Sequence, residues 1–453
     1  MSDKNDSAVS SQNDTLRPIP PEKRILGLPS YTFTWLGGCI SIGTFTLGSS
    51  TMENGLSLLQ TTVAMTLGSL ILIVLLCLND KACYATGIPY VAQLKSAFGT
   101  KGTVIPAIVR AAPALVWYGV QSWLAGSALN EVSKTLFHYD NMVLFFLLFQ
   151  LVQMVLSLTG FQGVKWVENV GAVFIVCALI YMYYVCTTAY GDVISQKLSH
   201  VEGTWGLPFW STVISFFGVN VLVLLNCGDY ARELKPGYST GSRGIAYFIA
   251  MVPTTVFMGI IGLMISTATG IANPIVAFST ALNNKILVVI TLCFIIFAQM
   301  TTNLLSNVIP PVYALMDLFK MKHTPAAILV SVLAVCTCPW FMVSDASAKG
   351  LDIFVQTYTA LAGPAVAILI VDYYIVRKKQ IEIEDLYLEN GPFKGVNPAA
   401  IAAIIAGAAI GFLNISVSFF TAFIPTALVY YFGTKYMKGA ANFRKDSVFE
   451  KQQ

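Results

Sequence analysis

Apolar stretches long enough to cross a lipid bilayer follow one another along most of the chain, separated by short polar connections. A spanning helix needs about 20 predominantly apolar residues, and twelve stretches come close to that length. They cover approximately residues 30–50, 56–78, 104–133, 141–159, 166–189, 209–228, 244–268, 283–317, 326–344, 353–376, 397–414 and 416–436. The pattern predicts an all-α polytopic membrane protein with 12 transmembrane helices.

The polar segments of the chain indicate where its tails and its membrane part begin and end. Residues 1–23 and 439–453 are polar or charged, so we expect two disordered cytoplasmic tails. Between them we expect a transporter core over residues 24–390 and two further spans within 391–438. The segment 79–102 is too polar to span, and we expect it to form a connection that ends in an amphipathic piece on the inner surface.

Composition and charge agree with a membrane location. Of the 453 residues 56% are hydrophobic and 11% are charged, whereas a soluble domain carries about 25% charged residues. With the N-terminus inside, the basic residues fall on the cytoplasmic side except for four, which are Lys134, Lys197, Lys285 and Lys349. The positive-inside rule then predicts a multi-pass protein of the inner or plasma membrane with both termini cytoplasmic.

Several function classes are excluded by what the sequence lacks. It contains no phosphate-binding loop, no nucleophile–base constellation and no basic patch for nucleic acid. We therefore expect neither an enzyme nor a partner of a nucleic-acid polymer, and no cofactor. An ion gradient would have to supply the energy for any transport.

The eighth apolar stretch carries an unusual run of uncharged polar side chains between Gln299 and Asn307. Because the bilayer core offers no water, these groups should face protein, a cavity or an ion. Ala298, Thr301 and Thr302 share one helix face, which presents a carbonyl and two hydroxyls. Oxygen ligands of this kind suit a small hard cation.

Two other spans contain glycines at mid-membrane. Gly37 and Gly38 lie in the first span, and Gly218 lies near Asn220 in the sixth. Glycine lets a helix unwind or approach a ligand. Interrupted spans five spans apart fit an inverted five-plus-five repeat with its site at the midplane, and close packing of helices at small residues is the alternative.

The third and eighth spans offer candidate substrate ligands. Trp117 and Gln121 are four residues apart and share a helix face, which combines a flat π surface with an amide. Asn303 and Asn307 are also four apart, and on a straight helix they point nearly opposite to the Thr301–Thr302 face. These residues suit a planar heterocycle with N–H and C=O groups, although packing and bonding between helices would also explain them.

Charged residues mark the cytoplasmic ends of spans 3 and 6. Asp229 could pair with Arg110 or Arg232 and so help to close a cytoplasmic gate. A solvated charge near a span end is the simpler alternative.

A set of motifs resembles the nucleobase–cation symporter family one, whose members import hydantoins, allantoin, uracil, cytosine and related heterocycles. The motifs are Gly87-Ile88-Pro89, Ser96-Ala97-Phe98-Gly99, Trp117-x3-Gln121-x-Trp123, Thr301-Thr302-Asn303-x3-Asn307-x2-Pro310 and Asp372-Tyr373-Tyr374. The resemblance runs from about residue 24 to 390. It implies the leucine-transporter-type inverted repeat, with spans 11 and 12 outside it.

Family roles follow from this resemblance, position by position. Trp117 resembles the stacking tryptophan, and Gln121 and Asn307 resemble the residues that bond to the substrate. The family's sodium site would fall on five oxygens, namely the carbonyls of Gly37, Ile40 and Ala298 and the hydroxyls of Thr301 and Thr302.

One position departs from the hydantoin-type members, which carry a second tryptophan in span 6 where this chain has Asn220. The loss of one stacking face together with the gain of an amide favours a smaller or more polar ring, such as uracil, cytosine, allantoin or a purine base.

The sequence thus predicts a secondary active importer of such a heterocycle, coupled to a cation, Na⁺ or alternatively H⁺. The alternatives are a symporter of the same fold for a vitamin-precursor pyrimidine or an amino acid, and a transport-dead sensor.

Overall fold

Each predicted apolar stretch forms a helix or a broken series of helices. The computed structural model describes residues 14–40, 42–51, 54–271, 274–281, 284–341, 347–388 and 390–450. Its main helices are α2 (Leu28–Cys39), α3 (Ile42–Ser50), α4 (Leu58–Thr86), α5 (Tyr90–Phe98), α6 (Val104–Phe137), α7 (Met142–Ser157), α8 (Gly160–Ser199), α9 (Leu207–Gly218), α10 (Val221–Leu225), α11 (Gly228–Ala231), α12 (Thr240–Thr269), α13 (Pro274–Ala281), α14 (Lys285–Thr302), α15 (Ile309–Phe319), α16 (His323–Cys336), α17 (Ser347–Val371), α18 (Pro398–Leu413) and α19 (Ser418–Tyr436). Within the described residues, six helices are long and apolar enough to cross a membrane, and four shorter apolar helices accompany them.

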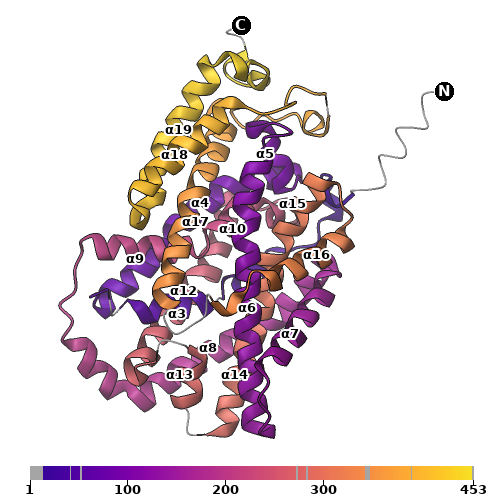
Figure 1. Ribbon diagram of the computed structural model, residues 1–453. Helices are drawn as coiled ribbons and strands as arrows, with labels where there is room; N and C mark the ends of the chain where they lie inside the picture. The colour runs from indigo at the N-terminus through magenta and orange to yellow at the C-terminus, as the bar shows by residue number, and fades with distance from the viewer. Residues whose placement is uncertain are drawn as a thin grey trace.

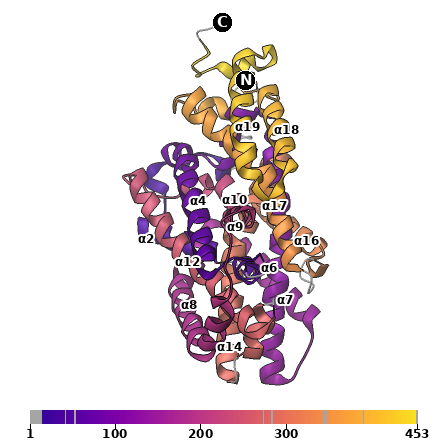
Figure 2. The same cartoon turned by 90° about the vertical axis from the view of Figure 1, so that its left-hand side faces the viewer.

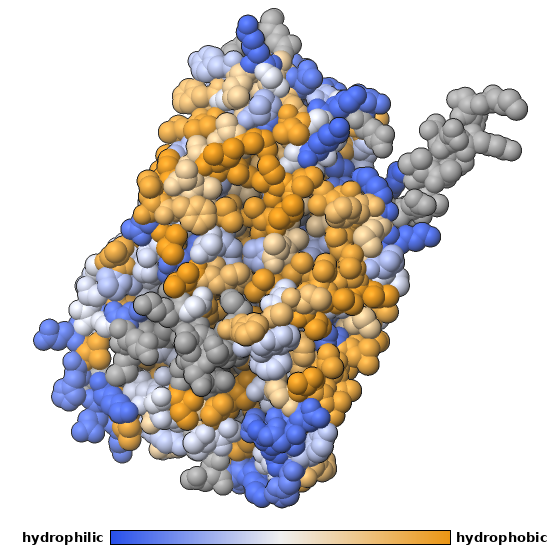
Figure 3. All heavy atoms as spheres, in the orientation of Figure 1, coloured by the Kyte–Doolittle hydropathy of each residue, from blue (hydrophilic) through white to orange (hydrophobic). Residues whose placement is uncertain are grey.

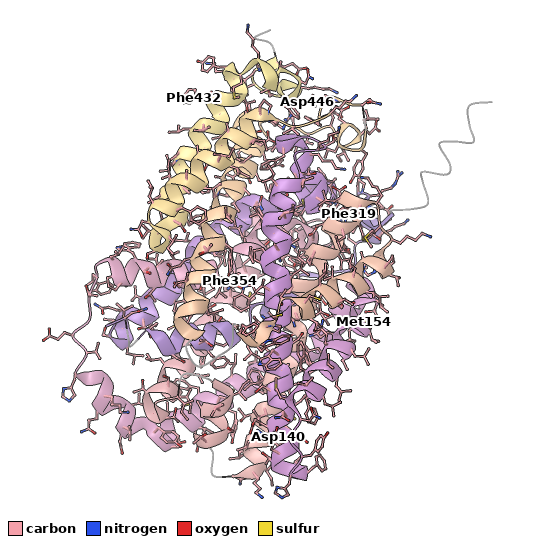
Figure 4. All side chains as sticks on the ribbon, in the orientation of Figure 1. Asp140, Met154, Phe319, Phe354, Phe432 and Asp446 are labelled. Atoms are coloured by element: carbon pink, nitrogen blue, oxygen red, sulfur yellow. The ribbon has the colours of Figure 1, made fainter. Side chains whose placement is uncertain are left out.

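The molecule is elongated, with the C-terminal helices α18 and α19 toward one end (Figure 1). Hydrophobic side chains cover most of the middle of the visible face, and hydrophilic side chains gather toward its two ends (Figure 3). Asp140, just after α6, lies at the end opposite Asp446 (Figure 4), so α6 crosses much of this length. The arrangement is that of a multi-pass membrane protein.

The first and sixth spans are interrupted, as their glycines predicted. The first consists of α2 and α3, which are separated by an extended residue, Ile40. The sixth consists of α9, α10 and α11, with breaks near Asn220 and Asn226. The last two spans, α18 and α19, pack together on the outer side of α17 (Figure 2). The two breaks lie five spans apart, as the inverted repeat requires.

The predicted end of the second span at residue 78 is wrong, because α4 continues to Thr86 through residues that we expected to form a polar connection. Asp80 is fully buried there and pairs with Arg243 of α12 at 2.7 Å. The hydroxyl of Tyr247 also donates to this carboxylate. A buried charge needs such partners, and they allow the helix to stay inside the protein until Gly87 ends it in a left-handed conformation.

The prediction of disordered tails is also wrong for residues 14–23 and 439–450, which the structure describes. The remaining tail residues, 1–13 and 451–453, lie outside the described residues. Near the N-terminus the backbone carbonyl of Leu16 accepts a hydrogen bond from the hydroxyl of Tyr387, and the side chain of Leu16 is buried. Near the C-terminus Phe443 and Phe449 are buried. Both segments pack at one end of the molecule because they bring apolar side chains that the rest of the core can cover.

An ionic cluster anchors the C-terminal segment. Arg377 and Asp372, both buried, pair at 2.9 Å just beyond α17. The guanidinium also donates to the backbone carbonyls of Phe443 and Lys445. The hydroxyls of Ser96 and Tyr430 donate to the carboxylate, so α5 and α19 meet at the same point.

Candidate functional site

The break in the first span brings backbone oxygens toward the eighth span. Helix α2 ends at Cys39, where the carbonyl of Gly37 accepts the backbone N–H of Ile40 at 3.3 Å. The last carbonyls of a helix are open to partners outside the helix. Gly38 allows the close approach, since a Cβ atom there would lie 2.2 Å from a methyl group of Leu305. The first span therefore approaches the side chains of the eighth span closely at this glycine.

Five oxygens converge at this meeting point. The hydroxyl of Thr302 lies 3.0 Å from the carbonyl oxygen of Gly37 and also donates to the carbonyl of Ile40. The hydroxyl of Thr301 lies 3.0 Å from the carbonyl oxygen of Ala298 and 3.5 Å from that of Gly37. These are the five oxygens that the family resemblance implied for a sodium site, and uncharged oxygens of this kind fit a small hard cation.

The eighth span changes its helical form directly after Thr302. Residues Asn303–Val308 form a π-helical segment between α14 and α15. A π turn holds one more residue than an α turn and is frequent at functional sites. Asn307 and Ser306 consequently line the same cavity as Thr302, whereas a straight helix would have turned Asn307 away from it.

A small cavity lies beside these five oxygens. It is lined by Gly38, Arg110, Trp117, Gln121, Val219, Asn220, Leu222, Val223, Thr302, Ser306 and Asn307. Its volume of about 20 Å³ holds roughly one water molecule, so a heterocycle can enter only if side chains or helices move apart. Four of the predicted substrate residues, Trp117, Gln121, Asn220 and Asn307, are brought together here.

Two predicted substrate residues lie behind the cavity instead. Asn303 donates to the carbonyl of Tyr118 and the hydroxyl of Ser122, and its oxygen accepts from Asn307 at 2.8 Å. Asn303 therefore orients Asn307. Gly218 packs against α17, where an added Cβ atom would lie 2.8 Å from Val355.

Sequence reasoning missed the contribution of α17. The indole N–H of Trp117 points to the hydroxyl of Tyr358 at 3.4 Å, and this hydroxyl donates to the carbonyl of Gly218 at 3.0 Å. The ring of Phe354 packs against Trp117 with the ring centres 6.0 Å apart. Figure 4 labels Phe354 near the centre of the helix bundle. Aromatic residues in an apolar span look like ordinary core residues, so the sequence carried no signal for this role.

The proposed pairs of Asp229 with Arg110 or Arg232 are not formed as direct ion pairs. The side chain of Asn226 stands between two of these groups: its oxygen accepts from Arg110 at 2.7 Å, and its amide donates to Asp229 at 3.2 Å. Asp229 also accepts the backbone N–H of Tyr90, the first residue of α5, at 2.8 Å. A carboxylate suits a helix N-terminus, whose free N–H groups carry partial positive charge.

The two arginines bond to backbone instead. Arg110 is buried, and besides Asn226 it donates to the carbonyl of Ser306 in the π-helical segment. Arg232 donates to the carbonyls of Thr15 and Arg17 near the N-terminus. Arg110 thus joins the cavity to the π-helical segment, and Arg232 joins the end of α11 to the N-terminal segment around Thr15 and Arg17.

No group of three or more His, Cys, Asp or Glu side chains gathers in the part of the chain that the structure describes. The oxygens around Thr302 differ from such a cluster because they come from backbone carbonyls and hydroxyl groups.

Known proteins resemble this chain over nearly its whole length. It is 25% identical to the hydantoin permease of Microbacterium maritypicum over 441 residues, 94% of this chain and 89% of that protein. It is 28% identical to the purine-uracil permease NCS1 of Arabidopsis thaliana over 438 residues, 88% of this chain and 70% of that one.

The fold has a solved counterpart as well. The nucleobase-cation-symport-1 family transporter Mhp1, in a closed conformation with bromovinylhydantoin bound, superimposes with a TM-score of 0.84 at 24% identity, covering 96% of this chain and 99% of that one. A family model described as "Permease for cytosine/purines, uracil, thiamine, allantoin" matches residues 18–437. The chain therefore belongs to this family of permeases.

Proposed function

We propose that this protein imports a planar heterocycle of the nucleobase or hydantoin type together with Na⁺, by alternating access. The observation that carries the proposal is that Thr302 belongs both to the five-oxygen cluster and to the lining of the cavity. Trp117 and Asn307 line the same cavity. An ion and a solute bound there would be neighbours, and each would favour the arrangement of helices that the other needs.

The residues of the cavity have distinct roles in this proposal. Trp117 supplies the stacking face, held in place by Tyr358. Gln121 and Asn307 bond to the N–H and C=O groups along the edge of the ring. Asn220 offers an amide at the break of the sixth span, which favours a small or polar ring such as uracil, cytosine, allantoin or a purine base.

The coupling ion would occupy the cluster around Thr301 and Thr302. Neutral oxygens from backbone and hydroxyl groups keep the site uncharged without the ion. Bound Na⁺ would therefore tie the break in the first span to the start of the π-helical segment in the eighth, where the substrate residue Asn307 lies.

The cytoplasmic gate would form where Arg110, Asn226 and Asp229 connect the cavity to α5. Arg232 would close the same end by holding the N-terminal segment. In this proposal both termini are cytoplasmic, in agreement with the distribution of basic residues.

Uptake into proteoliposomes tests the function. Vesicles that contain the purified protein would receive radiolabelled uracil, cytosine, allantoin, adenine or hydantoin under an inward Na⁺ gradient, an inward H⁺ gradient or neither. Concentrative uptake of at least one of these compounds under the Na⁺ gradient supports the proposal. Uptake that responds to the H⁺ gradient alone refutes sodium coupling, and no uptake of any compound refutes the substrate class.

A further inference from the structure

An apolar groove opens on the outer surface between α6, α15 and α16. Its volume is about 370 Å³, and every residue that lines it is aliphatic or aromatic. Ala111 of α6 and Ala314 of α15 are among these residues, and their small side chains leave room between the helices. Ile108 and Phe319, also in the lining, are 53% and 69% exposed.

The surroundings of the groove are those of a lipid-facing surface. Ile328, Leu329 and Val332 on the outer side of α16 are exposed, and this part of the visible face is largely hydrophobic (Figure 3). Figure 4 labels Phe319 at the margin of the molecule. Water would be excluded here, and an empty groove would forfeit the van der Waals contacts of its walls. The hydrocarbon chain of a lipid is the available group that restores those contacts.

Positive charge collects at one end of the groove. Lys320 directly follows Phe319, Lys322 precedes α16, and Lys101 lies three residues before Val104, another residue of the lining. All three lysines are exposed. Asp317 lies at the same corner, 3.6 Å from Lys95 and 3.9 Å from Lys320, so it offsets part of this charge. The net charge of these side chains remains positive.

We propose that this groove binds an anionic phospholipid. One acyl chain would lie between α6 and α15, and the phosphate group would contact Lys320 and Lys322, with Lys101 on the opposite side. Basic sites between transmembrane helices at the cytoplasmic surface are suited to acidic headgroups. The combination of an apolar groove with lysines at its end distinguishes this place from the rest of the lipid-facing surface.

The bound lipid would act on the pair of helices that carry the cavity. Helix α6 bears Trp117 and Gln121, and α15 continues from the π-helical segment that bears Asn307. A lipid chain between their ends would fix the spacing of these helices. The proposal concerns lipid alone and holds whichever solute the protein carries.

Native mass spectrometry of the full chain tests the site. The detergent-solubilised protein would be mixed with equal amounts of dioleoyl phosphatidylglycerol and dioleoyl phosphatidylcholine, and the retained adducts would be counted. We expect preferential retention of one phosphatidylglycerol. In the double variant Lys320→Gln/Lys322→Gln, the ratio of phosphatidylglycerol to phosphatidylcholine adducts should fall roughly fivefold for each lysine that is removed. Ala111→Phe, which fills the groove, should lose the adduct altogether.

Matched controls lie elsewhere on the surface. Lys285→Gln removes an exposed lysine at the start of α14, and Ala409→Phe adds a ring on the exposed side of α18. Both should retain the wild-type adduct, and the thermal unfolding of all variants would establish that they are folded. Equal retention of the two lipids by the wild type would overturn the proposal, as would a wild-type adduct in either groove variant.

Discussion

The hydroxyl of Thr302 lies 3.0 Å from the carbonyl oxygen of Gly37, and this contact joins the eighth span to the break in the first. Thr302 ends α14, and the π-helical segment with Asn307 begins at the next residue. One residue therefore contacts the proposed ion site and the proposed substrate cavity together. If Na⁺ and a heterocycle bind as proposed, this geometry would couple their binding through one residue.

The stacking role of Trp117 predicts a steep loss of binding. Trp117→Ala should weaken the binding of the preferred heterocycle by about 1–3 kcal/mol, in line with base–aromatic stacking elsewhere. Trp117→Phe should retain part of this energy because it keeps a flat ring. Isothermal titration with the purified variants measures both effects. Equal affinities of the alanine variant and the wild type would remove Trp117 from the site.

The contact of Tyr358 with Trp117 predicts a smaller effect. Tyr358→Phe removes the hydroxyl that accepts from the indole and donates to Gly218, so we expect substrate affinity to fall by about 1 kcal/mol, the usual worth of a net hydrogen bond. Tyr374 lies in the segment directly after α17, and its hydroxyl donates to the carbonyl of Leu78. Tyr374→Phe is therefore the control and should bind the heterocycle as the wild type does. A wild-type affinity for Tyr358→Phe would show that Trp117 needs no such support.

The amide at position 220 should control selectivity. Asn220→Trp should shift preference toward bulkier, less polar hydantoins and away from the native ligand, because it adds an aromatic wall and removes a hydrogen-bonding group. Competition binding of wild type and variant against one panel of nucleobases, allantoin and hydantoins measures the shift. Identical profiles would mean that Asn220 does not contact the substrate.

Asp229 should influence transport more than binding. Asp229→Asn keeps the shape of the side chain but weakens its bond to the first N–H of α5, which lies away from the cavity. The maximal uptake rate should fall several-fold, while the affinity measured by titration stays near the wild-type value. Glu22→Gln, which changes an exposed acidic residue of the N-terminal segment, is the control. An equal loss of affinity in Asp229→Asn would instead indicate a direct or structural role.

The two ion pairs that hold the C-terminal segment should differ greatly in their contribution to the free energy of unfolding. Arg377→Gln leaves the buried carboxylate of Asp372 without its partner, which typically costs about 3–5 kcal/mol. Lys445→Gln removes a surface pair with Asp385 and should have a small effect. Thermal unfolding in detergent compares them. Similar unfolding temperatures for the two variants would contradict the importance of the buried cluster.

The surface pair also has a pH dependence of known sign. The bond to Asp385 raises the pKa of Lys445. Its contribution is therefore complete below the pKa of a free lysine and disappears as the pH rises through the higher pKa of the folded protein. The Lys445→Gln variant should accordingly be insensitive to this alkaline transition.

The spans and their breaks could be predicted because they depend on local patterns. Apolar runs of sufficient length located the six long apolar helices of the described residues, and Gly37, Gly38 and Gly218 marked the two interruptions. The sequence also predicted that Trp117, Gln121 and Asn307 belong to one site, since their chemistry is unusual in a membrane, and all three line the cavity. These features need only neighbouring residues for their interpretation.

Features that depend on several elements could not be predicted. The π-helical segment changes which residues share a face, so Asn307 joined the side of Thr302 although the α-helical period placed it elsewhere. Asn226 separates Asp229 from Arg110 in a way that opposite charges at span ends do not reveal. The packing of Phe443 depends on a surface formed by distant segments, and its polar neighbours suggested disorder instead.

The central claim is that Na⁺ and the heterocycle bind together through Thr302, and a sodium titration of substrate affinity tests it most directly. We predict that Na⁺ tightens the binding of the preferred heterocycle to the wild type. Thr302→Ala and Thr301→Ala should each require about tenfold more Na⁺, as expected for the loss of about 1.4 kcal/mol, whereas Thr302→Ser should behave as the wild type. A wild-type affinity that does not change with Na⁺, or an unchanged sodium dependence in both alanine variants, would contradict the account.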